Sequence, residues 1–125
     1  MREIKFRAWD KKGERFIERF MVSKNGEILG KDFDVLNESI FSWDNAVLIQ
    51  YTNLKDKNGK EIYEGDIIAI ENNNYDPSNG DNPILLLEVK QEIGAYVIGD
   101  YLLRDFESSE MEKVGDIYEY PELLK

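Results

Sequence analysis

Short runs of β-branched and aromatic residues, separated by glycine-containing turns, restrict the fold of this 125-residue chain more than any other feature. Residues 46–52 form one such run, and residues 67–71 form another directly after Glu64-Gly65-Asp66. Their length and composition are typical of strands. The chain is therefore predicted to be mostly β, with strands joined by tight turns such as the Asn-Gly steps at 25–26 and 58–59.

The first 22 residues are predicted to form a β-hairpin. Ile4, Phe6 and Ala8 alternate with Lys5, Arg7 and Trp9, as in a strand that buries one face. This alternation places Trp9 with Lys5 and Arg7 on the exposed face. A turn at 10–13 leads to a second strand at 16–22, and the Asn-Gly step at 25–26 predicts a type I′ turn.

Two stretches are predicted to be loops. In residues 31–45 the spacing of Phe33, Leu36, Ile40 and Phe41 favours a loop with one short helical turn. Residues 72–83 contain five asparagines, two prolines and one glycine, which predicts a surface loop without strand or helix. Strands are expected again at 84–90, at 95–98 and shortly before Pro121, which suits the start of a terminal helical turn.

Three blocks at the start, middle and end of the chain carry a family pattern. They read MREIKFRAWD at 1–10, QYTNLKDKNGKEIYEGDII at 50–68 and VGDIYEYPELL at 114–124. Together they resemble the YopX family of phage and prophage proteins. That family commonly has glycine at the position of Asn53 and asparagine at those of Asp116 and Tyr120; because asparagine tolerates positive φ, we expect the turn at Asn53 to be kept. The resemblance implies a phage gene product made inside a bacterial host and carries no established activity.

The expected fold is an N-terminal β-hairpin region over residues 1–45 and a small SH3-like β-barrel over 46–125, with one or two short helical turns. Gly65-Asp66 before alternating aliphatic residues is a common entry into such a barrel, because glycine permits a sharp turn and aspartate accepts nearby backbone N–H groups. The same pattern is compatible with one continuous fold.

The chain contains neither cysteine nor histidine. This excludes Ser–His and Cys–His nucleophiles and zinc sites of the usual Cys/His type. Carboxylate, lysine or tyrosine chemistry and oxygen-ligated Mg²⁺ or Ca²⁺ stay open, and no cofactor is predicted. No apolar run approaches the roughly 20 residues of a membrane span, and the charged N-terminus lacks a secretory signal. We therefore expect a cytoplasmic protein of the bacterial host, without a membrane partner.

The net charge of −10 is unevenly distributed along the chain. Residues 1–19 hold seven basic and four acidic side chains, and the rest holds nine basic and 22 acidic ones. Most of the surface should therefore repel nucleic acid and attract a basic partner. The basic first strand, with Arg2, Lys5, Arg7 and Trp9, could instead touch single-stranded nucleic acid, or its charges could protect a sheet edge.

Tyr51, Tyr63, Glu64 and Asp66, with Trp9, form the candidate binding surface, because aromatic residues beside polar turns are typical of barrel recognition surfaces. The structural alternative is that Tyr51 and Tyr63 pair across a hairpin while Gly65-Asp66 shapes a turn.

Acidic and amide side chains suggest two further sites. Asp76, Asn79, Asp81 and Asn82 offer oxygens but do not follow the EF-hand spacing, so a solvated loop is predicted there rather than a calcium site. Six acids near the C-terminus could imitate the phosphates of DNA or form an ordinary solvated face: Glu107, Glu110, Glu112, Asp116, Glu119 and Glu122. No spacing singles out a catalytic carboxylate pair or a metal site.

The predicted function is that of a non-enzymatic phage or prophage accessory module that binds another protein or a second copy of itself. Trp9, Trp43 and Tyr120 are the aromatic residues that would suit such contacts. The alternatives are nucleic-acid binding by the basic strand, mimicry of DNA toward a host DNA-binding protein, and a metal-dependent carboxylate hydrolase.

Overall fold

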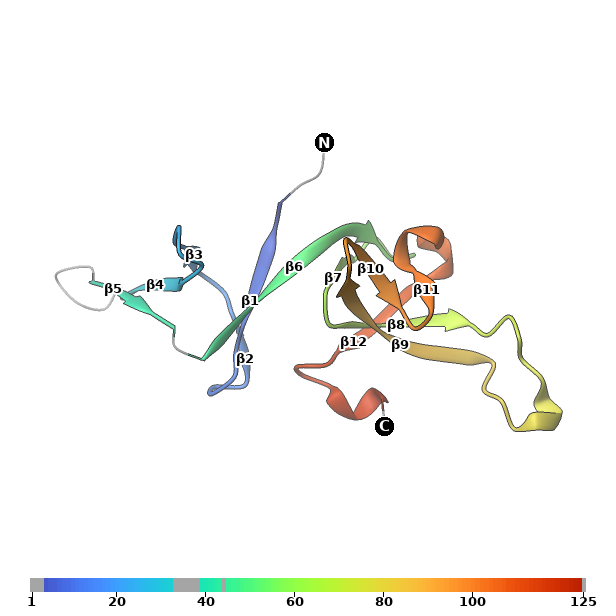
Figure 1. Cartoon of the computed structure of the whole chain (residues 1–125). Coiled ribbons are helices and arrows are strands. Elements are labelled where there is room, and N and C mark those ends of the chain that lie inside the picture. The colour runs from blue at the N-terminus through green and yellow to red at the C-terminus, as the bar shows by residue number, and fades with distance from the viewer. Residues whose placement is uncertain (1–3, 33–38, 44, 125) are drawn as a thin grey trace. The chain divides into compact units, whose positions relative to one another are not determined.

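Strands account for most of the regular structure. The computed structural model describes residues 4–32, 39–43 and 45–124 (Figure 1). Within them it contains twelve strands and four 3₁₀-helices of three or four residues each. The mostly β fold class is confirmed, and the short helical turns number four where one or two were expected. No helix in these described ranges has the length and apolar character needed to cross a membrane.

The chain divides into two compact units. The N-terminal unit consists of Lys5–Ile49, and the main unit consists of Gln50–Lys125 together with Met1–Ile4. The long strand β6 (Ala46–Lys55) contributes its first four residues to the N-terminal unit and the others to the main unit.

The N-terminal unit contains two groups of paired strands. β1 (Phe6–Asp10) pairs antiparallel with β2 (Arg15–Ile17), which places Trp9 opposite Phe16. β4 (Ile28–Asp32) lies between β3 (Met21–Val22) and β5 (Ser39–Ser42) in a three-stranded sheet. The small core of the N-terminal unit is formed by Ala8, Ile17 and Ile28. Four partly buried residues pack against them: Phe20, Trp43, Ala46 and Leu48.

Two expectations for this unit were wrong. The strand expected at 16–22 is interrupted: β2 ends at Ile17, and β3 pairs with β4 instead, because Glu18 and Arg19 are both exposed and break the alternation. Residues 39–42 form a strand rather than a loop with a helical turn. All four of these residues pair with β4, and this pairing favours extended backbone over a helical turn. Phe33 and Leu36 lie outside the described residues.

The Asn-Gly step at 25–26 does not form the expected type I′ turn, and the step at 58–59 is built in the same way. Only the glycines adopt positive φ, +82° at Gly26 and +78° at Gly59, whereas a type I′ turn needs positive φ at both central residues. A polar side chain three residues before each glycine explains the difference. The Ser23 hydroxyl and the Asp56 carboxylate each accept two backbone N–H groups of the turn and stabilise a wider loop.

The main unit is built on a five-stranded antiparallel sheet that curls as a half-barrel (Figure 1). In spatial order its strands are β11 (Tyr101–Leu102), β10 (Ala95–Ile98), β9 (Ile84–Glu92), β8 (Asp66–Glu71) and β12 (Glu112–Asp116). The later part of β6 pairs with β7 (Glu61–Tyr63). The core of the unit consists of Ile62, Ile68, Ile70, Val89, Ile98, Leu103 and Met111.

Short helices interrupt the connections of the main unit. They are η1 (Pro77–Asn79), η2 (Leu103–Asp105), η3 (Ser108–Glu110) and η4 (Pro121–Leu124). The 72–83 segment is the expected exposed loop, but η1 forms inside it because Asp76 caps the turn and Pro77 suits its first position. The terminal turn at Pro121 is confirmed.

Candidate functional site

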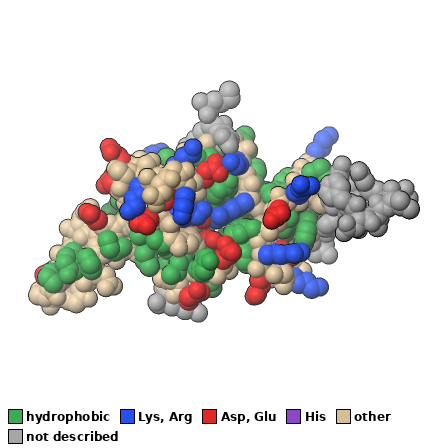
Figure 2. All heavy atoms as spheres, turned by 180° about the vertical axis from the view of Figure 1, so that it is seen from behind, with side chains coloured by type: hydrophobic (Ala, Val, Ile, Leu, Met, Phe, Trp, Pro, Cys, Tyr) green, Lys and Arg blue, Asp and Glu red, His purple; other side chains and the backbone are tan. Residues whose placement is uncertain are grey.

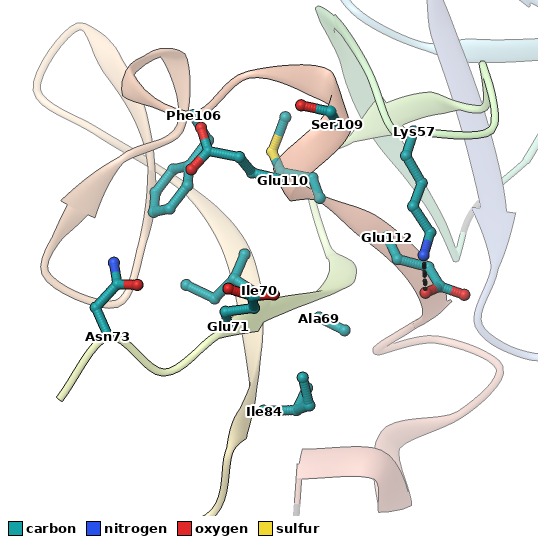
Figure 3. Close-up of a pocket in the computed structure, with 11 residues that line it drawn as sticks. Lys57, Ala69, Ile70, Glu71, Asn73, Ile84, Phe106, Ser109, Glu110 and Glu112 are labelled. Carbon is teal, nitrogen blue, oxygen red and sulfur yellow. Dashed lines mark ion pairs between the residues drawn. The ribbon is translucent and has the colours of Figure 1, made fainter. Parts of the chain in front are cut away.

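The main unit contains a groove where strand β8 ends. Two cavities of about 360 and 260 Å³ share five lining residues, Ile70, Glu71, Asn73, Phe106 and Glu110. We call them together the acidic groove. Figure 3 shows Phe106 and Glu110 on one side of it and Lys57 and Glu112 on the other. The larger cavity is at the lower end of the range of small-molecule pockets, which is about 300–1,000 Å³.

The apolar part of the groove follows from strand pairing. Glu71 lies opposite Ile84, and Ala69 lies opposite both Leu86 and Glu112, so these side chains share one face of the sheet. Ile84, which lines the groove, is 47% exposed, and Leu86 lies on the same face outside the groove lining and is 37% exposed. On the face shown in Figure 2, hydrophobic side chains likewise reach the surface among charged ones.

Helices η2 and η3 complete the groove. Phe106 follows η2, where its ring is half-buried and packs edge-on against Tyr101 at 5.8 Å between centroids. A capping box fixes η3: Glu110 Oε1 accepts the Glu107 N–H at 2.8 Å. The next residue, Met111, is buried in the core and anchors this segment.

Carboxylates predominate on the rim. Glu71, Glu110, Glu112 and Asp105 line the acidic groove, and Lys57 is the one cation among the described lining residues. The Lys57 ammonium lies 2.9 Å from Glu112 Oε2, and both side chains are 46% exposed. Such a rim attracts cationic groups and repels phosphates.

A buried polar network positions the Lys57 turn. Asp56 accepts the N–H groups of Asn58 and Lys60 through Oδ1 and that of Lys113 through Oδ2, all at 2.9 Å. Burial alone would raise the pKa of Asp56, but these N–H donors and the nearby Lys60 charge together lower it below its ordinary value. The Lys57 N–H also donates to the Met111 carbonyl, so the turn is held beside β12.

The network extends to Asp66, one of the sequence-predicted residues. Asp66 is fully buried and lies 3.0 Å from the Lys113 ammonium, which also donates to the Glu61 carbonyl. Asp66 Oδ2 accepts the Tyr63 N–H at 2.7 Å, which confirms that the Gly-Asp aspartate bonds nearby backbone. The contact between Lys113 and Asp56 gave no signal in the sequence, because the two residues are distant along the chain.

The structure brings Tyr51, Tyr63, Glu64 and Asp66 together, mostly beneath the surface. Tyr51 and Tyr63 are cross-strand partners with centroids 5.4 Å apart, and they are only 5% and 7% exposed. Glu64 is half-buried, and its N–H donates to the Gln50 carbonyl. Tyr51 also lines a separate cavity of about 330 Å³ with Gln50, Gln91 and Arg104. This arrangement matches the structural alternative, in which the tyrosines pair and the turn is shaped by Asp66.

Trp9 belongs to the N-terminal unit, and its expected exposure was wrong. It is 6% exposed and packs edge-on against Phe16 at 4.8 Å. Lys5 and Arg7 are half-buried rather than freely exposed, and the Arg7 guanidinium lies 4.7 Å from the Phe16 ring centroid. Arg2 lies outside the described residues. The basic strand thus presents less free charge than its sequence indicates.

Several acids of the other candidate sites form hydrogen bonds within the fold. Asp76 accepts hydrogen bonds from the Ser78 hydroxyl and N–H, which lower its pKa. Asp116 is buried and accepts the N–H groups of Tyr118 and Glu119. In the part of the chain that the structure describes, no three acidic side chains gather as metal ligands would.

Comparisons with known proteins agree with this architecture. The family model described as YopX protein matches residues 5–125. No curated protein matches the chain. The crystal structure of protein EF1440 from Enterococcus faecalis is 25% identical, covers 98% of this chain and 99% of its own, and has a TM-score of 0.66. Protein yopX from Bacillus subtilis is 24% identical, with coverages of 96% and 97% and a TM-score of 0.61.

Proposed function

The chain belongs to the YopX family, and from its acidic groove we propose that it is a non-enzymatic protein-interaction module whose partner presents basic and apolar side chains. In this proposal the protein is a phage- or prophage-encoded accessory that acts inside the bacterial host. The acidic groove is its docking site.

One observation carries the proposal: exposed apolar surface and unbalanced carboxylates occur together in one groove. Apolar contact supplies affinity, whereas charge selects the partner and speeds the encounter. The whole main unit reinforces that selection. It holds eight basic and 18 acidic residues, a net charge of −10, while the N-terminal unit holds eight of each sign. A basic protein segment is therefore attracted to the main unit over several ångströms, and DNA is repelled.

The other functions have less support. A nucleic-acid site on β1 would rely on Trp9, which is buried, and on Arg7, which contacts Phe16. A metal-dependent hydrolase needs gathered carboxylates, and the described residues contain no such cluster. DNA mimicry would use an extended acidic face, but Asp116 is buried and Glu110 caps η3.

The test is an affinity capture from bacterial host lysate with three forms of the tagged chain. The groove variant is Glu71→Lys/Asp105→Lys, and Glu92→Lys/Glu119→Lys makes the same charge change at exposed positions outside the groove. We expect a basic protein to be retained by the wild type and the control and to be lost by the groove variant. Equal retention of that protein by all three forms would show that the acidic groove is not the docking site. If only further copies of the chain are recovered, the proposal of a basic partner protein is wrong.

A further inference from the structure

Lys57 occupies a distinctive place in the acidic groove. Its ammonium pairs with Glu112 at 2.9 Å (Figure 3), and four carboxylates line the groove around this pair. Its backbone is fixed, because its N–H donates to the Met111 carbonyl and the preceding Asp56 ties the turn to Lys113. The side chain is nearly half exposed, and ion pairs of that exposure are weak. A fixed backbone with a weakly held cation makes a contact that another cation can replace.

The proposed function supplies such a cation. Resting on that function, we propose that Lys57 is an intramolecular placeholder for an arginine side chain of the partner and competes with it for Glu112. The free protein then neutralises part of its own groove. A partner must displace Lys57 to use all of the rim, so the pair lowers the affinity of every cationic segment by a small factor.

Arginine fits the groove better than lysine for two reasons. Its planar guanidinium can donate two parallel hydrogen bonds to one carboxylate, which a lysine ammonium cannot do. A second arginine of the same partner segment can stack on an aromatic ring at the other side of the groove, where the half-buried Phe106 lies beside Glu110 (Figure 3). The same chain already contains such a contact, since Arg7 lies over the Phe16 ring at 4.7 Å.

The test measures binding of labelled synthetic peptides by fluorescence anisotropy. The probes are a short peptide of alternating arginine and leucine, its lysine counterpart and its glutamate counterpart. The proteins are the wild type, Lys57→Gln, the groove variant Glu71→Lys/Asp105→Lys and Lys90→Gln, where Lys90 is an exposed β9 residue that does not line the groove. We expect Lys57→Gln to bind the arginine peptide about two- to fivefold more tightly than Lys90→Gln does. The glutamate peptide should not bind.

Each outcome separates this inference from the function on which it rests. Equal affinities of Lys57→Gln and Lys90→Gln would overturn the placeholder, and loss of binding in Glu71→Lys/Asp105→Lys would still support the module. Equal binding of the lysine and arginine peptides would overturn the arginine preference. No binding by any form would overturn both proposals. Thermal unfolding of Lys57→Gln close to that of the wild type shows that a gain in affinity does not come from a loosened fold.

Discussion

At the scale of single residues, Asn53 shows how one backbone angle constrains the sequence. It has φ +68° inside β6, where the register with β7 shifts between Tyr51 and Leu54. The expectation that Asn53 tolerates positive φ is therefore confirmed, although the residue lies at an irregularity within β6 and not in a turn between strands. Asn53→Gly and Asn53→Ala both remove the side chain, so their difference isolates the backbone. We expect the alanine variant to be less stable than the glycine variant by about 1 kcal/mol in urea unfolding. Equal stabilities would mean that the bulge relaxes to negative φ.

Asp56 gives a prediction that depends on pH. Its folded-state pKa is lowered, so its contribution to stability is present above the unfolded value of about 3.8 and disappears as pH falls through the folded value. Asp56→Asn should cost about 1–3 kcal/mol of unfolding free energy at about pH 7, because buried N–H donors lose a charged acceptor. The cost should shrink at about pH 3. Urea unfolding at both pH values measures it, with the exposed Asp100→Asn as control. If the loss of unfolding free energy is the same at both pH values, the ionised form of the Asp56 carboxylate is not what stabilises the turn.

At the scale of elements, local pattern predicted strands well where one face is buried and turn residues flank the run. The entry into β8 through Gly65-Asp66 and the terminal turn at Pro121 are examples. At β1 the strand and its pairing with β2 were predicted correctly, but the exposure of Trp9 was not, because Ala8, Trp9 and Asp10 are all buried. Phe16 of the neighbouring β2 packs against Trp9, so the side of the strand that the alternation assigns to solvent is covered there. The acidic groove was missed because Lys57, Glu71 and Phe106 come together only through the pairing of distant strands.

The β7–β8 turn allows steric and backbone effects to be separated. Gly65 has φ +88°, and a Cβ atom there would lie 2.7 Å from Tyr118 Cε2. Gly94, in the β9–β10 turn, has φ +77° and nothing within 4 Å of the same position. We expect Gly94→Ala to cost about 1 kcal/mol and Gly65→Ala about 2–3 kcal/mol in denaturant unfolding. Equal costs would show that Tyr118 moves aside and does not hold the C-terminal segment against the turn.

At the scale of the whole molecule, the two units carry separate optical probes. Both tryptophans, Trp9 and Trp43, belong to the N-terminal unit, and all seven tyrosines belong to the main unit. The charge is divided in the same way, because the main unit carries the full −10 and the N-terminal unit is balanced. Tryptophan and tyrosine signals therefore report on two parts of the chain that should respond differently to salt.

This division predicts opposite salt effects on stability and on binding. Added salt screens the self-repulsion of the main unit, so its tyrosine-detected unfolding midpoint should rise by about 4–8 °C if screening is worth about 1 kcal/mol. The tryptophan-detected midpoint should stay nearly constant, because the N-terminal unit has no net charge to screen. The same salt should weaken the binding of the arginine peptide to the acidic groove. The peptide is attracted by the same carboxylates that repel one another in the free protein. If both midpoints rise together, the units unfold as one cooperative structure and form one domain rather than two. If the midpoint rises but peptide affinity does not fall, apolar contact with Ile84 and Phe106 rather than charge holds the partner.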